Sequence, residues 1–303
     1  MPNVKLKNQL HLHFLVFIAG FTGILGELIT IKAIPLVWIR MIIATIIILI
    51  YIKISKAKIT ITPKKFFKLS LAGIIIALHW ITFFGSIDAS NVSIALTMFS
   101  TGAFFASFIE PLIYKRKIIW YEIVFGLLVV IGVLIIMESE MKYIKGIVLG
   151  VFSAFFASVF AVLNGKFLEQ HSPTTISLYE FIGGVIFISI FMLLIGVDFE
   201  TEVFVLTKTD VIYLLILGSV CTAYAFIAAV SVMRHISPYS VVLTYNLEPV
   251  YGIILAILIV PEKEKMSSSF YLGAAIIILI VFLNAILKHS RKVKMKQDSL
   301  QHN

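Results

Sequence analysis

Ten long apolar segments dominate this sequence of 303 residues and limit the folds open to it. Each segment is about as long as the 20 residues that a helix needs to cross a bilayer, and the segments lack the alternation of barrel strands. A mean hydropathy of +1.05 with 14% charged residues lies outside the range of soluble proteins. The sequence therefore predicts an all-α membrane protein with ten transmembrane helices, at residues 12–31, 34–52, 69–88, 92–114, 119–137, 146–166, 175–196, 211–231, 239–260 and 270–287.

Basic residues fall mainly on one side of these predicted helices. Of the 25 lysines and arginines, eighteen lie near the termini and in every second loop, whereas the opposite loops hold six. Cytoplasmic loops carry such an excess, so we expect both termini in the cytoplasm, residues 288–303 as a basic cytoplasmic tail, and insertion in the cytoplasmic membrane. The net charge of +9 is thus information about orientation and does not indicate a nucleic-acid partner.

The two halves of the sequence resemble each other. Residues 93–97, Ser-Ile-Ala-Leu-Thr, recur as Ser-Val-Val-Leu-Thr at 240–244, and each half contains five of the ten apolar segments. An odd number of crossings inverts the second copy in the membrane, and inverted repeats are common in secondary transporters, whose binding site lies between the repeats. We therefore expect a first five-helix repeat at 12–137 and a second at 146–287.

The motifs of intramembrane enzymes are missing from the sequence. It contains no His-Glu-x-x-His, no Gly-x-Ser-x-Gly and no pair of aspartates within the apolar segments. Cys221 is the single cysteine, which excludes disulfides and thiolate metal sites. We therefore expect no catalysis, cofactor or metal. A channel would need a ring of like groups along its path, so one central glutamate favours a carrier.

Charged side chains inside the segments are the candidate functional groups, because a charge at the bilayer centre costs at least about 2.5 kcal/mol unless it faces a partner or a cavity. The ionisable residues at such positions are Glu27, Arg40, His79, Glu110, Glu180 and Glu248. Glu27 and Arg40 lie at equal depth on neighbouring segments, which predicts a structural ion pair. The alternative is that Arg40 binds a substrate carboxylate through its planar donor fork.

The ninth segment carries the densest signal, at Tyr245-Asn246-Leu247-Glu248-Pro249. Pro249 removes a helical hydrogen bond in mid-segment, and a break at this depth is tolerated only beside protein or a water-filled cavity. Gly102 falls opposite Pro249 in the repeat alignment. We therefore predict a helix break in each half and a binding face around Glu248.

Other side chains at similar depth complete the predicted solute cavity. His79 and Trp80 lie in the middle of the third segment, Thr101 precedes Gly102, and Glu180 falls opposite Arg40 in the repeat. Helix packing explains Thr101 equally well, and hydrogen-bonded packing is the commoner role of a lone membrane histidine such as His79. The predicted cavity residues are Glu248, Tyr245, Asn246, His79, Trp80, Thr101 and Glu180.

Three stretches make residues 12–287 resemble the EamA-like family of the drug/metabolite transporter superfamily. They are Trp38-Ile39-Arg40, the ninth-segment run that ends in Pro249, and Glu262 thirteen residues later. The family's fourth helix usually bears the proline in each repeat and closes with Gly-Glu. Here Gly102 and Lys115 stand at those first-half positions, and Pro261 replaces the second-half glycine.

The resemblance implies a carrier that exports a small metabolite, amino acid-like or drug-like, by alternating access around a mid-membrane cavity. An uncoupled facilitator or a channel-like permease is the alternative. A buried carboxyl such as Glu248 can exchange protons, so protons are a candidate coupling ion. Equally, a neutral Glu248 would hydrogen-bond the carbonyl freed by Pro249. Both alternatives stay open, as do the solute's identity and the oligomeric state.

Overall fold

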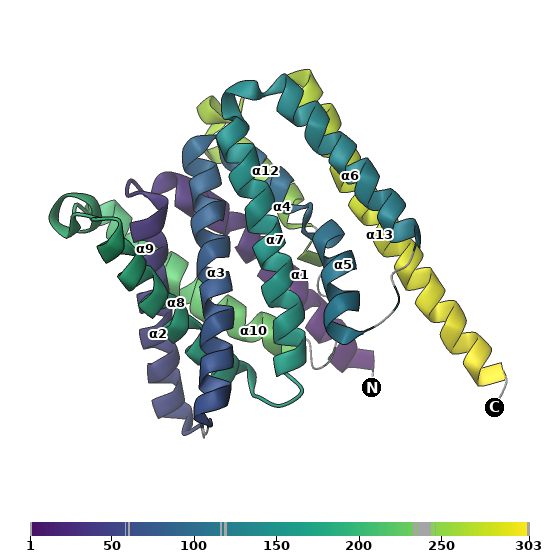
Figure 1. Ribbon diagram of the computed structural model, residues 1–303, viewed down its shortest axis with the longest axis horizontal. Coiled ribbons are helices and arrows are strands. Elements are labelled where there is room, and N and C mark those ends of the chain that lie inside the picture. The colour runs from purple at the N-terminus through teal and green to yellow at the C-terminus, as the bar shows by residue number, and fades with distance from the viewer. Residues whose placement is uncertain are drawn as a thin grey trace.

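The chain folds into helices throughout its described part. The computed structural model describes residues 2–57, 59, 61–115, 117, 120–232, 235, 244–245 and 247–301, and no strand occurs among them (Figure 1). The helices are α1 (Pro2–Leu28), α2 (Ala33–Ser55), α3 (Pro63–Ala89), α4 (Val92–Phe99), α5 (Gly102–Tyr114), α6 (Trp120–Ser139), η1 (Met141–Tyr143), α7 (Ile144–Phe167), α8 (Pro173–Leu194), η2 (Phe199–Val203), α9 (Lys208–Gly218), η3 (Ser219–Tyr224), α10 (Ala225–Val232), α12 (Glu248–Ile259), η4 (Pro261–Lys263) and α13 (Ser268–Gln301).

The apolar helices confirm a helical membrane protein. Seven stretches are long and apolar enough to cross a membrane: Leu6–Leu28, Ala33–Ser55, Pro63–Ala89, Val92–Tyr114, Met141–Phe167, Pro173–Leu194 and Lys208–Val232. Shorter apolar helices cover Ile123–Ser139, Glu248–Ile259 and Ser268–Ile280. The total of ten crossings stays a prediction, and part of the predicted ninth span lies outside the described residues.

Polar residues in the loops mark where several of these helices begin. Asn91 precedes α4, and its side chain accepts a hydrogen bond from the amide of Ile94 at 2.9 Å. Ser172 caps α8 in the same way, and Thr207 and Asp210 form a reciprocal capping box at α9. Such caps satisfy amides that have no partner within the helix.

Three of the expected spans are interrupted. The fourth span is divided where α4 ends at Phe99 and α5 begins at Gly102. The eighth span contains the π-helical turn η3 between α9 and α10, and the last part of the ninth, α12, begins at Glu248 with Pro249 in its first turn. At these interruptions, some backbone carbonyl and amide groups within the membrane lack the regular hydrogen bonds of an α-helix.

The two halves interlock through close helix contacts. Helices α3 and α8 touch so closely that a Cβ atom at Gly73 would lie 1.9 Å from the carbonyl oxygen of Glu180. At the contact of α1 with α12, a Cβ at Gly20 would lie 3.0 Å from the backbone nitrogen of Gly252. Glycines in such contacts let membrane helices approach backbone to backbone.

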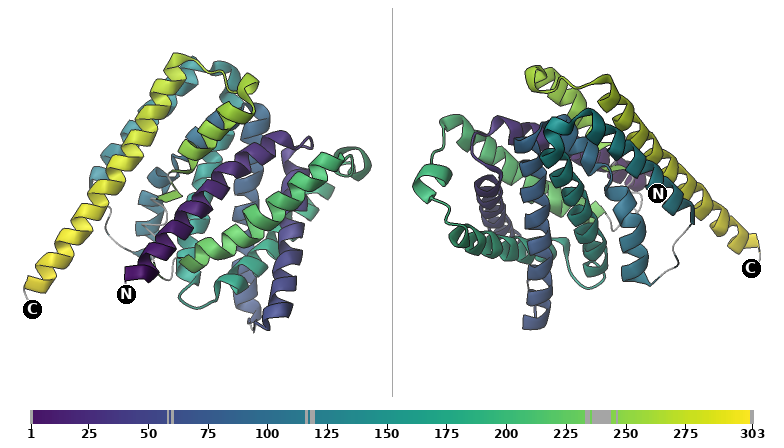
Figure 2. Two further views of the ribbon diagram at one scale, coloured as in Figure 1. Left: turned by 180° about the vertical axis from the view of Figure 1, so that it is seen from behind. Right: turned by 45° about the horizontal axis from the view of Figure 1, so that its top comes forward.

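Helices α6 and α13, one from each half, form a pair that leans away from the other helices (Figures 1 and 2). The pair meets at Gly132 and Gly273: a Cβ on Gly273 would lie 3.0 Å from the Gly132 carbonyl oxygen. Large apolar side chains such as Leu127 and Leu279 are exposed on it. In a bilayer, lipid would cover these surfaces.

Candidate functional site

Arg40 lies at the centre of a buried cluster where helices of the two halves meet. Its side chain, on α2, is 2% exposed. Nε donates to the Thr222 hydroxyl at 2.5 Å, and Nη2 donates to the Cys221 carbonyl oxygen at 3.5 Å. Nη1 is buried and has no hydrogen-bond partner among the described residues. One end of this donor fork therefore has no acceptor in the described part of the chain.

The π-helical turn η3 supplies both acceptors of Arg40. Within it, the Thr222 hydroxyl donates to the Leu217 carbonyl oxygen, five residues earlier, at 2.6 Å. Gly218 allows α2 to approach, because a Cβ there would lie 3.2 Å from the Arg40 carbonyl oxygen. π-Helical turns are rare and are frequent at functional sites, since they offer backbone groups that a regular helix would bind.

Trp80 on α3 forms an aromatic wall against the guanidinium. The Cζ atom of Arg40 lies 4.0 Å from the centre of the Trp80 ring. Phe181 and Phe226, both from the second half, pack around that ring with centres 5.6 and 6.5 Å from it. A desolvated cation over an indole is stabilised by about 2 kcal/mol, so the Trp80 ring stabilises the charge without accepting a hydrogen bond from Nη1.

His79, the neighbour of Trp80, is engaged in packing. Its Nδ1 lies 3.0 Å from the Ser153 carbonyl oxygen and 2.9 Å from the Ser153 hydroxyl. A carbonyl only accepts, so Nδ1 carries a hydrogen. The positive charge of Arg40 repels a second charge here. Aromatic rings surround the imidazole, namely Trp80, Phe83, Phe99 and Phe160. These surroundings favour a neutral histidine that joins α3 to α7.

Glu248 supplies a carboxyl group to the cluster from the second half. It is the first residue of α12 and is 7% exposed. Glu248 and Arg40 attract each other electrostatically, and Glu248 also interacts with the phenol of Tyr245. Asn246, which the sequence placed at the same site, lies outside the described residues. The site thus brings together a guanidinium of the first half and a carboxyl group of the second.

Thr101 is bound within its own helix break. Its hydroxyl donates to the Met98 carbonyl oxygen at 2.6 Å, and the residue is 2% exposed. The carbonyl oxygen of Gly102 accepts a hydrogen bond from Ser158 on α7 at 2.7 Å. The backbone of this break is therefore satisfied by protein, which agrees with a packing role for Thr101.

Glu27 pairs with a residue other than the predicted one. Its carboxylate binds Lys263, in the loop after α12, whereas Arg40 makes the contacts described above. The predicted Glu27–Arg40 ion pair is absent, because the loop after α12 folds over the end of α1 and brings a lysine from the other half. The prediction relied on the equal depth of Glu27 and Arg40 in the membrane, and depth alone does not identify a partner from a distant loop.

Glu180 is on α8, where its backbone contacts α3, and it is fully buried. Its hydrogen-bond partner among the described residues is Asn164 on α7, whose Nδ2 donates to Oε2 at 3.4 Å. Glu180 precedes Phe181, which packs on Trp80, but its carboxylate is not one of the groups that contact Arg40.

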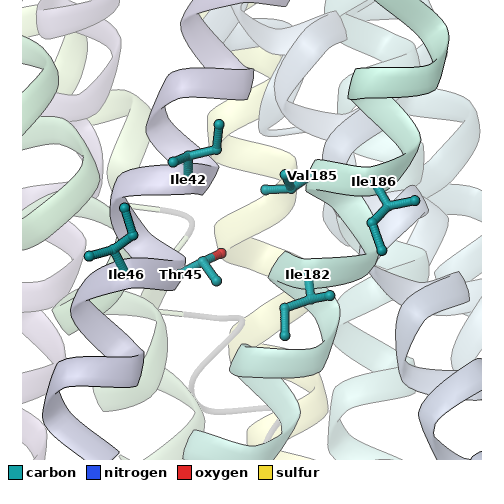
Figure 3. Close-up of a pocket in the computed structure, with 6 residues that line it drawn as sticks. All are labelled: Ile42, Thr45, Ile46, Ile182, Val185 and Ile186. Atoms are coloured by element: carbon teal, nitrogen blue, oxygen red, sulfur yellow. The ribbon is translucent and has the colours of Figure 1, made fainter.

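An apolar pocket of about 210 Å³ opens between α2 and α8 (Figure 3). It is lined by Ile42, Thr45, Ile46, Ile182, Val185 and Ile186. The Thr45 hydroxyl already donates to the Met41 carbonyl oxygen at 2.7 Å. The pocket therefore offers no free polar group to a solute, and the exposed Ile46 and Ile186 place it at the surface that lipid would cover.

Sequence reasoning missed Thr222, Cys221 and Ser153 as partners of the cluster. The available signal was a run of small and polar residues, 218–222, within an apolar segment. Such a run also suits helix packing, so the π-helical turn that it forms was not apparent.

The comparisons with known proteins agree with this architecture. No curated protein sequence matches the chain. A solved structure titled "Crystal structure of protein" has a similar fold: the TM-score is 0.65 at 13% sequence identity, with 93% of this chain and 98% of that chain covered. The sequence model of the EamA-like transporter family matches residues 10–138 and again 144–286. This match confirms the resemblance, and the chain belongs to the EamA-like transporter family.

Proposed function

We propose that the protein is a secondary transporter that exports a small amino acid-like solute across the cytoplasmic membrane by alternating access. The solute's carboxylate binds Arg40 and its amine binds Glu248, with the ring of Trp80 as the apolar wall. Membership of a transporter family supports transport in general. The choice of solute rests on the buried site alone.

This proposal rests on Nη1 of Arg40, which is buried and has no hydrogen-bond partner in the described part of the chain. A buried polar group without a partner costs free energy, and a charged one costs more, so such groups are rare unless a ligand completes them. A carboxylate matches the planar fork of arginine better than other small groups do. Since Glu248 offers the opposite charge from the other half, a solute with both charges would bridge the halves.

Export is supported by where the two halves are bonded. Both termini lie at one end of the molecule (Figure 1), and we call the opposite end, with residues 260–267, the distal end. There the carboxylate of Glu264 accepts hydrogen bonds from the backbone amides of Val92 and Ser93, at 3.1 and 3.0 Å, and the carboxylate of Glu27 binds Lys263. The carboxylate of Asp210 similarly accepts hydrogen bonds from the backbone amide and the hydroxyl of Thr30, both at 2.8 Å.

The terminal end has fewer such bonds between the described parts of the halves. His11 and Tyr224 form one there, at 2.7 Å. As far as the described residues show, opening this end breaks fewer polar contacts than opening the distal end. If the termini are cytoplasmic, the resting protein accepts solute from the cytoplasm, as an exporter requires.

The test is ligand-dependent thermal stability of the purified protein. Single amino acids, simple amines and simple carboxylates are added one at a time. A ligand present at 100 times its Kd stabilises the folded state by about 2.7 kcal/mol. We expect zwitterions to raise the melting temperature more than amines or carboxylates do, and Arg40→Gln and Glu248→Gln to abolish the rise.

Glu200→Gln, the same chemical change at an exposed position of η2, is the matched control and should retain the rise. Equal stabilisation of the wild type and both site variants would refute this solute site. Stabilisation by uncharged solutes alone would refute the amino acid-like class.

Proton coupling through Glu248 stays a prediction. Proton movement during solute flux is measured in liposomes that contain a pH-sensitive dye, under an imposed solute gradient. Coupled export changes the internal pH as solute moves, and Glu248→Gln abolishes the change. Solute flux that moves no protons and ignores a pH gradient would make the protein a facilitator.

A further inference from the structure

Glu180 and Asn164 form a buried polar pair outside the Arg40 cluster. Glu180 is 0% exposed and Asn164 is 2% exposed. Asn164 Nδ2 donates to one carboxyl oxygen of Glu180 at 3.4 Å. The other carboxyl oxygen, Oε1, and the amide oxygen of Asn164 are both buried and have no partner among the described residues. Two acceptor atoms thus lack a hydrogen.

A single proton on Glu180 can complete this pair. A neutral carboxylic acid donates through its O–H and still accepts through its other oxygen, whereas a carboxylate only accepts. An amide facing a carboxylic acid therefore forms two hydrogen bonds, N–H to carboxyl and O–H to amide oxygen. Burial without a cation favours the same neutral form, because an isolated buried charge is far more costly than a neutral polar group.

Charged groups on the packed helices are engaged elsewhere. Helices α2, α3 and α10 pack against α8, and Asn164 comes from α7. Arg40 binds Thr222, His79 binds Ser153, and Lys166 lies over the Tyr114 ring at 5.6 Å. The other titratable residues of these helices, α8 included, are Tyr51, Lys53, Lys64, Lys65, Lys68, Asp88, Lys145 and Tyr179, and none of them interacts electrostatically with Glu180. Helix α10 has no titratable residue.

The backbone of Glu180 lies at a contact that alternating access would open, and α3 packs against both α8 and α7, the two helices that carry the pair. Helix α3 belongs to the first half and α8 to the second, and rocking of the halves is the usual transport movement of inverted-repeat carriers. Besides Gly73 against Glu180, the contact joins Gly183 to Ser70, whose Cα would lie 2.5 Å from a Cβ on Gly183. Glu180 is seven residues from the start of α8 at the terminal end, or about 10 Å along the helix.

We propose that Glu180 is a proton-binding site that gates the terminal end. The carboxyl binds one proton when α3 and α8 close, with Asn164 as its partner, and releases it to the same side when they part and water reaches it. This proposal rests on the alternating access proposed above, and it makes the proton a ligand of the gate rather than a transported ion. Because the closed form holds one more proton, the closing equilibrium changes by about tenfold per pH unit, and low pH favours closure.

The test measures opening directly and needs no solute. In a Cys221→Ser background, the change Ser177→Cys places a thiol on α8 one turn before Glu180, at a position that is 0% exposed in the closed structure. Labelling by a small reagent, corrected for the ionisation of the thiol with an unfolded standard, reports opening. We expect labelling to rise about tenfold per pH unit as the pH increases.

Variants separate the gate from mere packing. Glu180→Gln retains an amide–amide pair with Asn164 but cannot ionise, so labelling should stay low at every pH. Asn164→Leu removes the partner and should raise labelling at every pH. Glu200→Gln, at an exposed position of η2, should keep the wild-type profile.

Labelling independent of pH in the otherwise unchanged protein would overturn the gate. A profile that follows sodium concentration at constant pH would replace the proton with a metal cation and also overturn it. Retained pH dependence in Glu180→Gln would assign the proton to another group. Failure of solute binding at Arg40 leaves these labelling results unchanged, so the two proposals fail independently.

Discussion

Arg40 binds three kinds of group at once: the hydroxyl of Thr222, the carbonyl of Cys221 and the ring of Trp80. These contacts, with a hydroxyl dipole, a carbonyl dipole and a ring face, stabilise the guanidinium charge in a low-dielectric interior. The predicted ion pair with Glu27 would have occupied the fork. Its absence leaves a cation that can still bind an anion.

At this scale we predict that Trp80→Leu lowers the free energy of unfolding by about 2 to 5 kcal/mol, because it removes the cation–π contact and leaves a cavity. Trp80→Phe keeps an aromatic face and should cost less. Trp120→Leu is the matched control, since Trp120 is 68% exposed, and should change stability by no more than about 0.5 kcal/mol. Unfolding in mixed detergent measures all three, and equal effects of Trp80→Leu and Trp120→Leu would contradict the assignment.

The helix interruptions show which elements a sequence reveals. Pro249 and Gly102 break or weaken a helix through local backbone chemistry, so the sequence predicted interruptions where α12 and α5 begin. The π-helical turn η3 has no such local signal, because its geometry depends on packing against Arg40 from α2. The partner of Glu27 was likewise missed, since Lys263 lies 236 positions away. The hydropathy pattern of the sequence shows which charged residues lie within the membrane segments. Which residue of the other half contacts each of them depends on the tertiary fold.

For the α3–α8 contact we predict that Gly73→Ala destabilises the protein by about 1 to 3 kcal/mol, because the new methyl group collides with the backbone of Glu180. Gly85→Ala on the same helix is the control: its Cβ would lie 3.5 Å from Leu149, an ordinary contact. The control should be neutral or stabilising, since alanine favours helix. Equal melting temperatures of the two variants would show that α3 and α8 are not in close contact.

The whole molecule combines two interlocked halves, a distal end bonded by polar groups and a basic terminal end. The family match in two consecutive blocks explains the halves, and the charge bias predicts their orientation. Single cysteines at Ser139, Ser268 and Ser299, in the Cys221→Ser background, test it with an impermeant thiol reagent on intact cells. We expect labelling at the first two positions alone. Labelling only at Ser299 would invert the topology and, with it, the direction of transport.

We propose that a solute bound between Arg40 and Glu248 is carried by alternating access. Counterflow in liposomes tests it most directly: vesicles loaded with an unlabelled amino acid that stabilises the protein are diluted into a trace of the labelled one. A carrier accumulates label transiently above the external concentration, and Arg40→Gln and Glu248→Gln should lose this overshoot while Glu200→Gln retains it. Label that only equilibrates, without overshoot and without saturation, would mean a channel and would contradict the account.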